Sequence, residues 1–95
     1  MATVKENLIA ARALIDTPEK WGKGAWHSRG CFCAIGAVLE AQGKLGRAAY
    51  GGETEVALMH ALPAGIGSVE DFNDQFRTTH ADIMALFDRA IEAQP

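Results

Sequence analysis

The stretch most informative about the fold is CFCAIGAVLEAQ, residues 31–42, which is followed by Gly43. Its length and the glycine after it predict a helix that ends at Gln42. Apart from Glu40 and Gln42 in the last turn, every residue in it is apolar or glycine. A helix that is apolar nearly all round is buried on most sides. We therefore expect this helix to be the central member of the fold.

The N-terminal segment has the signature of an amphipathic helix. Thr3 and Glu6 make a capping box, in which each side chain binds a backbone N–H that the helix start leaves free. A stripe of apolar residues at helical spacing accompanies it: Val4, Leu8, Ala11 and Ile15. Pro18 follows the helix and suits the first position of a short extra turn capped by Thr17.

Three more helices are predicted in the second half of the chain. The first covers residues 53–62, is stopped by Pro63, and turns three residues inward: Leu58, Met59 and Leu62. Ser68 opens a short helix with three residues on one face: Val69, Phe72 and Phe76. Thr79 with Asp82 opens the last helix. Its inward stripe consists of Ile83, Phe87, Ala90 and Ile91.

Together these patterns predict an all-α fold. No segment alternates as a strand does, and alanine is abundant. Residues 22–30, GKGAWHSRG, and residues 44–52 are glycine-rich connections in which we expect no regular element. Ninety-five residues make one domain, residues 1–95. We expect a compact bundle of about four main helices with short extra helical turns and Gly-rich loops, in which the first loop meets residues 68–76.

Charge and composition exclude several classes of protein. The net charge is −3, with five basic residues against one acid in residues 20–47 and eight acids against two arginines in residues 53–95. An acidic chain is a poor general nucleic-acid binder, although the basic segment can attract a small anion. No apolar run could span a bilayer, and charges near the N-terminus break a signal-peptide core. We expect a cytoplasmic protein with no membrane partner.

The first glycine-rich loop is a candidate ligand site. Trp21, Lys23, Trp26 and Arg29 lie along it, and it leads into the predicted helix start at Cys31. Free N–H groups at a helix start favour an anion, indole rings stack on planar groups, and lysine or arginine holds phosphate or carboxylate. We therefore predict a site for a small anionic ligand. The alternative is that the two tryptophans plug the open end of the core.

The two cysteines offer a different chemistry. A thiol at a helix start has a lowered pKa, so Cys31 or Cys33 could serve as a nucleophile. The candidate bases are His27, His60 and His80. Residues two apart on a helix point to opposite faces, and the neighbours are apolar, which favours small buried cysteines instead. Zinc ligands usually stand two to four residues apart, so we expect no metal and no cofactor.

Asn73 and Asp74 interrupt an otherwise apolar pattern. Asn73 lies at the margin of the stripe that holds Phe72, where a polar side chain must find hydrogen bonds. We expect Asn73 to bind loop backbone, with the first glycine-rich loop as the nearest candidate. The alternative is that Asp74 lines a ligand site together with Trp21 and Lys23.

Four short motifs in this order resemble a known family: Trp21-Gly22-Lys23-Gly24, Cys33-Ala34-Ile35-Gly36-Ala37, Phe72-Asn73-Asp74 and Thr79-His80-Ala81-Asp82-Ile83, the last leading into Leu86-Phe87-Asp88-Arg89-Ala90. The family comprises small bacterial and phage proteins and is catalogued only as a domain of unknown function. Where it often has tryptophan before Asn-Asp, this chain has Phe72, which keeps an aromatic ring. The resemblance runs from about Leu14 to Ile91 and implies a bacterial or phage origin but no activity.

From these observations we predict a small binding module. It would recognise another protein, or a small anion at the end that holds the loop. An accessory role, such as blocking a host-defence component, fits the resemblance. A monomer or a homodimer is expected, because Cys33, Ala37 and Ala41 form a helix face of small residues that a neighbour can approach. The alternative is a thiol-dependent enzyme that uses Cys31 or Cys33.

Overall fold

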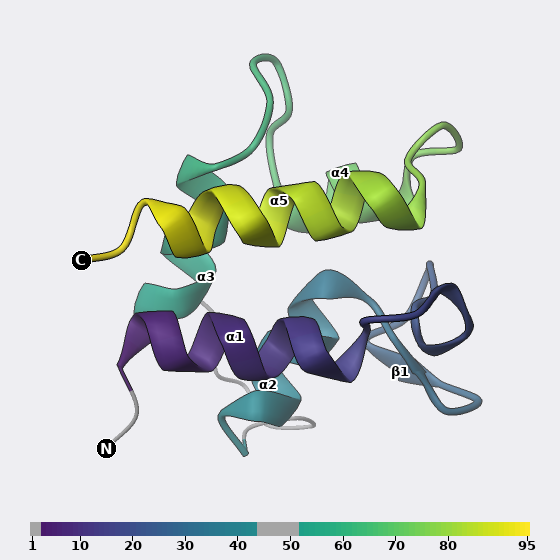
Figure 1. The fold of residues 1–95 in the computed structure, drawn as a ribbon. Coiled ribbons are helices and arrows are strands. Elements are labelled where there is room, and N and C mark those ends of the chain that lie inside the picture. The colour runs from purple at the N-terminus through teal and green to yellow at the C-terminus, as the bar shows by residue number, and fades with distance from the viewer. Residues whose placement is uncertain (1–2, 44–51) are drawn as a thin grey trace.

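Two long helices, α1 (Val4–Leu14) and α5 (His80–Glu92), frame the molecule and contact each other along its length. The structure is a computed structural model that describes residues 3–43 and 52–95. The helices run in opposite directions, so that α1 begins and α5 ends at the same end (Figure 1). Helices α2 (Ala34–Ala41), α3 (Glu53–His60) and α4 (Val69–Asp74) complete the helical part.

The predicted capping signals are present. The Thr3 hydroxyl accepts from the Glu6 amide at 3.1 Å, and the Glu6 carboxylate accepts from the Thr3 amide at 3.0 Å. Thr79 and Asp82 make the same reciprocal pair at the start of α5. The Ser68 hydroxyl accepts from the Asp71 amide at the start of α4. Each contact binds an amide that would otherwise lack an intrahelical partner.

The core forms around α2, as predicted. Every residue of α2 from Ala34 to Leu39 is buried. Helices α1, α3 and α4 contact α2, and α5 packs mainly on α1 and α3. The largest fully buried apolar side chains outside α2 are Leu8, Ile15, Leu58, Ile83, Leu86 and Phe87. Burial of such stripes is what stabilises helices of this length, which are marginal alone.

The all-α prediction is correct for the helices but misses a small sheet. Strands β1 (His27–Ser28) and β2 (Cys31–Phe32) pair antiparallel, with Arg29 and Gly30 as the turn. Both turn residues have positive φ, 52° and 81°, as a two-residue hairpin turn of the mirror-image kind requires. Strands of two residues are too short to show alternation in a sequence.

The hairpin also displaces the start of the central helix. Residues 31 and 32 use their backbone groups in strand β2, so α2 begins at Ala34 with Cys33 as its N-cap, three residues later than predicted. On the other side, Gly22 donates to the Phe32 carbonyl at 3.0 Å. A single-turn 3-10 helix, η1 (Pro18–Lys20), precedes this segment, and Thr17 makes no side-chain cap there.

Two apolar residues predicted to face inward do not. The Phe76 side chain is 97% exposed, because α4 ends at Asp74 and Gln75 adopts an extended backbone, so the helical spacing from Phe72 is not continued. Met59 of α3 is 45% exposed, whereas Leu58 is fully buried and Leu62 is partly buried.

Two features predicted from the sequence involve residues that the structure does not describe. The predicted connection at residues 44–52, apart from Gly52, lies outside the described residues, as do Lys44 and Arg47 of the basic segment.

Among the residues that the structure describes, no helix is long and apolar enough to cross a bilayer.

Candidate functional site

Asn73 joins three separate parts of the chain from the centre of one end of the molecule. Its side chain is fully buried. The Oδ1 atom accepts from the Trp21 indole at 2.7 Å and from the Ala34 amide at 3.0 Å. The Nδ2 atom donates to the Gly22 carbonyl at 3.1 Å and to Asp74 at 3.0 Å. These four bonds use the full capacity of an amide side chain. The predicted contact between Asn73 and the glycine-rich loop is thereby confirmed.

The loop is held against α4 by two further contacts. Lys23 donates through Nζ to the carbonyls of Gln75 and Phe76, just beyond the C-terminus of α4. A cation is favourable at that end of a helix, where carbonyl groups lack partners. Asp74 accepts from the Gly24 amide at 3.0 Å. The loop and α4, 50 residues apart in the sequence, therefore act as one surface.

The backbone of the loop also contacts α2. The Trp26 carbonyl accepts from the Cys33 amide at 3.2 Å and lies directly over Gly36. A Cβ at position 36 would stand 1.7 Å from this oxygen, so only glycine allows the contact. This contact holds the Trp26 backbone against α2 and so fixes the position from which its side chain extends.

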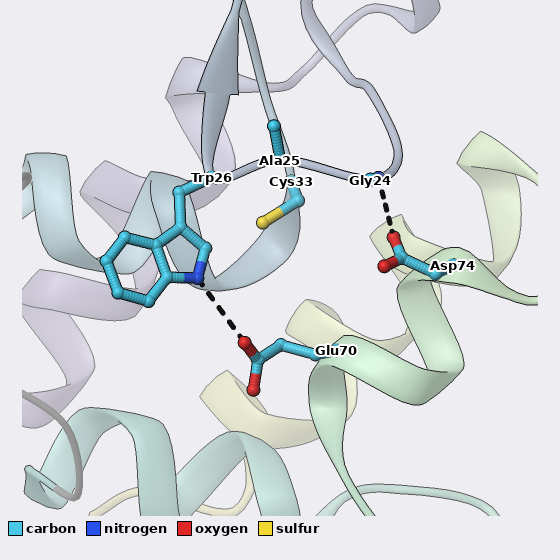
Figure 2. A pocket seen from close by; sticks show the side chains of 6 residues that line it. All are labelled: Gly24, Ala25, Trp26, Cys33, Glu70 and Asp74. Carbon is cyan, nitrogen blue, oxygen red and sulfur yellow. Dashed lines mark hydrogen bonds between the residues drawn. The ribbon is translucent and has the colours of Figure 1, made fainter.

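A hollow of about 290 Å³ lies between the loop and α4. Six residues line it: Gly24, Ala25, Trp26, Cys33, Glu70 and Asp74. Figure 2 shows the Trp26 indole and Glu70 on one side and Asp74 on the other, with Cys33 between them in this view. The Trp26 indole donates to Glu70 at 3.3 Å. The hollow thus has an aromatic wall and two carboxylates.

The Cys33 thiol is kept neutral by this setting. Burial raises the pKa of Cys33 above the ordinary value of 9.0, and the negative charges of Asp74 and Glu70 raise it further. Hydrogen bonds from backbone amides, including that of Gly36 at 3.3 Å, lower the pKa, but their effect is smaller than that of burial. The thiol therefore enters the hollow as an uncharged, weakly polar group.

The structure divides the five predicted ligand residues among three places. Trp26 and Asp74 line the hollow. Trp21 and Lys23 lie together outside it, with the Lys23 Nζ atom 5.5 Å from the centre of the Trp21 ring. Arg29 is exposed at the tip of the β1–β2 hairpin. The predicted set is therefore not one cluster.

The sequence analysis missed Glu70. It stands four residues before Asp74 in α4, a spacing that puts two side chains on the same side of a helix. This four-residue spacing can be read from the sequence and indicates that Glu70 and Asp74 share one side of the helix. What it could not indicate is that this side faces Trp26, which is 44 residues away.

Two of the three candidate bases, His27 and His80, contact groups other than the thiols. Cys31 donates to the Glu19 carbonyl at 3.1 Å, and the His27 ring stacks on Phe32 with 4.5 Å between ring centres. The ring of His80 bonds through Nε2 to the Ile15 carbonyl at the end of α1, at 2.7 Å. Within the described residues, no group of three or more His, Cys, Asp or Glu side chains is placed to hold a metal ion.

Comparison with known proteins places the chain in a family. Residues 1–93 match the family described as "Family of unknown function (DUF6197)". The chain belongs to this family. The match covers nearly the whole sequence and includes the loop, α2 and α4 that form the hollow. No curated protein and no solved structure is significantly similar to the chain.

Proposed function

We propose that the protein is a binding module that holds one cationic group, an ammonium or a guanidinium, in the hollow between Trp26 and Asp74. The observation that carries this proposal is the composition of the walls. An aromatic face attracts a cation, and a carboxylate on the opposite side neutralises its charge. Both groups come from segments locked together by Asn73, so the site exists before any ligand arrives.

Asp74 is the group best placed to bind the cation. It is exposed, and its Oδ1 atom accepts from the Gly24 amide and from Asn73. An ionised carboxylate offers about four acceptor positions, so Asp74 can bind a ligand while it holds the loop. Glu70 adds negative charge on the same side of α4.

The size of the hollow limits what it can hold. Pockets for whole small molecules span about 300–1,000 Å³. At about 290 Å³, this hollow lies at the lower end of that range, which favours a small group over a nucleotide. A lysine or arginine side chain presented by a partner protein, or a free small amine, has that size. Both sources carry the same chemistry, and the experiment below separates them.

The small anion predicted from the sequence has less physical support. Lys23, its main cationic candidate, is bound to backbone carbonyls beyond α4. At the start of α2, the amides of Ala34 and Gly36 are bound to Asn73 and Cys33. The two amides would have to give up existing hydrogen bonds to receive an anion, and Lys23 has only one of its three ammonium donors left for one. The raised pKa of the Cys33 thiol likewise favours binding over thiol catalysis. An accessory role in a bacterium or phage remains a proposal based on the resemblance alone.

Titration followed by ¹H–¹⁵N NMR tests the site, because the two tryptophans give two indole signals. We expect methylguanidinium and methylammonium to shift the Trp26 indole and the Gly24 amide, while the Trp21 indole stays unchanged. Phosphate and acetate should shift neither. If phosphate alone shifts these signals, the cationic site is wrong and the predicted anion site is favoured.

Charge-neutral variants complete the test. Asp74→Asn keeps an acceptor oxygen for Gly24 but removes the charge, and we expect affinity for the cation to fall about 10-fold or more. Asp71→Asn on the same helix is the matched control and should change affinity little. If the Gly-Arg-Gly tripeptide binds more tightly than methylguanidinium, a partner's side chain is the source. Equal loss in the two variants would show only a general charge effect and contradict the proposal.

A further inference from the structure

The only two basic residues in the acidic half of the chain line the same hollow. Residues 53–95 hold eight acids and two arginines, Arg77 and Arg89. Arg77 follows α4 and Arg89 lies in the last turn of α5, yet both line a hollow of about 260 Å³. Like charges that share one hollow repel each other, and a bound anion relieves that repulsion. This hollow shares no lining residue with the one between Trp26 and Asp74, so the two are separate.

Arg89 is held in place through one of its nitrogens. Its Nε atom donates to the carbonyl of Ala61, the C-cap residue of α3, at 3.1 Å. A guanidinium has five N–H donors, so four remain on the two terminal nitrogens. The bond to Ala61 therefore fixes the base of the group and leaves donors that can bind a carboxylate.

Arg77 extends from an anchored backbone. Lys23 binds the carbonyl of the preceding residue, Phe76. The following residue, Thr78, is buried, and its amide donates to Gln75 at 3.1 Å. The Arg77 side chain itself is exposed, and no acid in the described part of the chain forms an ion pair with it. Its charge is thus available to a ligand.

The rest of the lining limits the charge of that ligand. Asp82 contributes a carboxylate, which accepts from the Thr79 amide at 2.9 Å in the capping box of α5. Across the described residues, no ion pair joins Asp82 to either arginine. The two guanidinium groups and one carboxylate leave an excess of one positive charge. A monoanion balances this excess, whereas a dianion exceeds it.

We propose that this hollow binds a carboxylate group on a small apolar body, held by Arg77 and Arg89. The planar guanidinium matches a carboxylate and can bind both of its oxygens. Apolar side chains also line the hollow, namely those of Pro63, Phe72 and Ala85, and they can contact the body of the acid. A free small acid and the carboxyl end of a partner peptide carry the same chemistry. This site is independent of the proposed cation site.

Titration with benzoate followed by ¹H–¹⁵N NMR tests the site. We expect saturable shifts of the Arg89 Nε–H and Thr78 amide signals, with a dissociation constant of about 1–10 mM. The Trp26 indole, which reports on the other hollow, should not shift. Acetate lacks the apolar body, and phosphate above neutral pH is mainly a dianion, so both should bind at least about 5-fold more weakly. Tighter binding of phosphate than of benzoate would overturn the carboxylate assignment.

Substitutions at the hollow separate a site from a general charge effect. Arg77→Gln should weaken benzoate binding about 10-fold or more, and it breaks no ion pair. Arg29→Gln removes the same charge at the exposed hairpin tip and should change affinity less than about 2-fold. Asp82→Asn keeps an oxygen for the capping box but raises the excess charge, so affinity should rise about 3-fold or more.

The same titration distinguishes the two sources of the carboxylate. If the peptide acetyl-Gly-Phe with a free carboxyl end binds more tightly than benzoate, the end of a partner chain is the source. If it binds more weakly, a free small acid is the source. The absence of saturable shifts up to about 20 mM benzoate would overturn the proposal. An equal loss of affinity in Arg77→Gln and Arg29→Gln would overturn it too.

Discussion

At the scale of single residues, Asn73 does more to organise this protein than any charged side chain that the structure describes. It has no exposed surface, and its partners are the Trp21 indole, the Gly22 carbonyl, the Ala34 amide and Asp74. Removing one partner from such a set leaves the others buried and unpaired, which costs about 1–3 kcal/mol for each group that water cannot reach.

Replacement of Asn73 by alanine is therefore expected to lower the free energy of unfolding by about 3–4 kcal/mol. Urea denaturation followed by circular dichroism measures this change. Gln75→Ala, an exposed residue just beyond the same helix, is the control and should change stability by about 0.5 kcal/mol or less. A loss below about 1 kcal/mol for Asn73→Ala would mean that water replaces the amide, and the organising role would be wrong.

At the scale of elements, α2 is the buried helix against which α1, α3 and α4 pack. Its first amide is bound by Asn73, Cys33 caps its first turn at the Gly36 amide, and the same turn receives the Trp26 carbonyl over Gly36. Glycine normally weakens a helix relative to alanine. At position 36 that intrinsic preference is overruled, because the loop backbone occupies the space of a side chain.

Gly36→Ala is thus expected to destabilise the protein by about 3 kcal/mol or more, although alanine is the better helix former. The Trp26 indole signal in NMR should shift as the loop lifts from α2. Gly67→Ala is the matched control, since the nearest atom to its Cβ is 4.0 Å away and its φ is not positive. A Gly36→Ala protein as stable as wild type would show that the loop does not rest on the helix.

At the scale of the whole molecule, burial of the Cys33 thiol makes the free energy of unfolding depend on pH in the alkaline range. The pKa of Cys33 is raised in the folded state above the ordinary 9.0, chiefly by burial. The unfolded chain therefore loses this proton at a lower pH than the folded protein does. The contribution to stability is complete below the ordinary pKa and disappears as the pH rises through the folded value.

We expect the free energy of unfolding to fall as the pH rises above about 9, and to fall less steeply in Cys33→Ala. Urea denaturation at a series of pH values measures both slopes. Identical slopes for Cys33→Ala and wild type would contradict the assignment.

Much of the helical architecture could be predicted from the sequence, because its causes are local. Capping boxes at Thr3 and Thr79 act over three residues, and the apolar stripes of α1 and α5 repeat every three or four residues. The same local logic predicted that Asn73 needs backbone partners and that α2 is central. It failed where a neighbour overrides the pattern: the hairpin shortens α2, and the end of α4 at Asp74 leaves Phe76 in solvent.

Only the tertiary structure decided the candidate site. The tryptophans and Lys23 in the glycine-rich loop, with Asp74, predicted a ligand site at one end of the molecule. The sequence did not indicate which of these side chains lie together. The Trp21 indole is bound by Asn73, 52 residues away, and Lys23 is held beyond α4, which leaves Trp26 and Asp74 to form the hollow. Local spacing determines which face of a helix a side chain occupies. What that face meets depends on the packing of distant segments, and here that packing lines the hollow with Trp26 and two carboxylates.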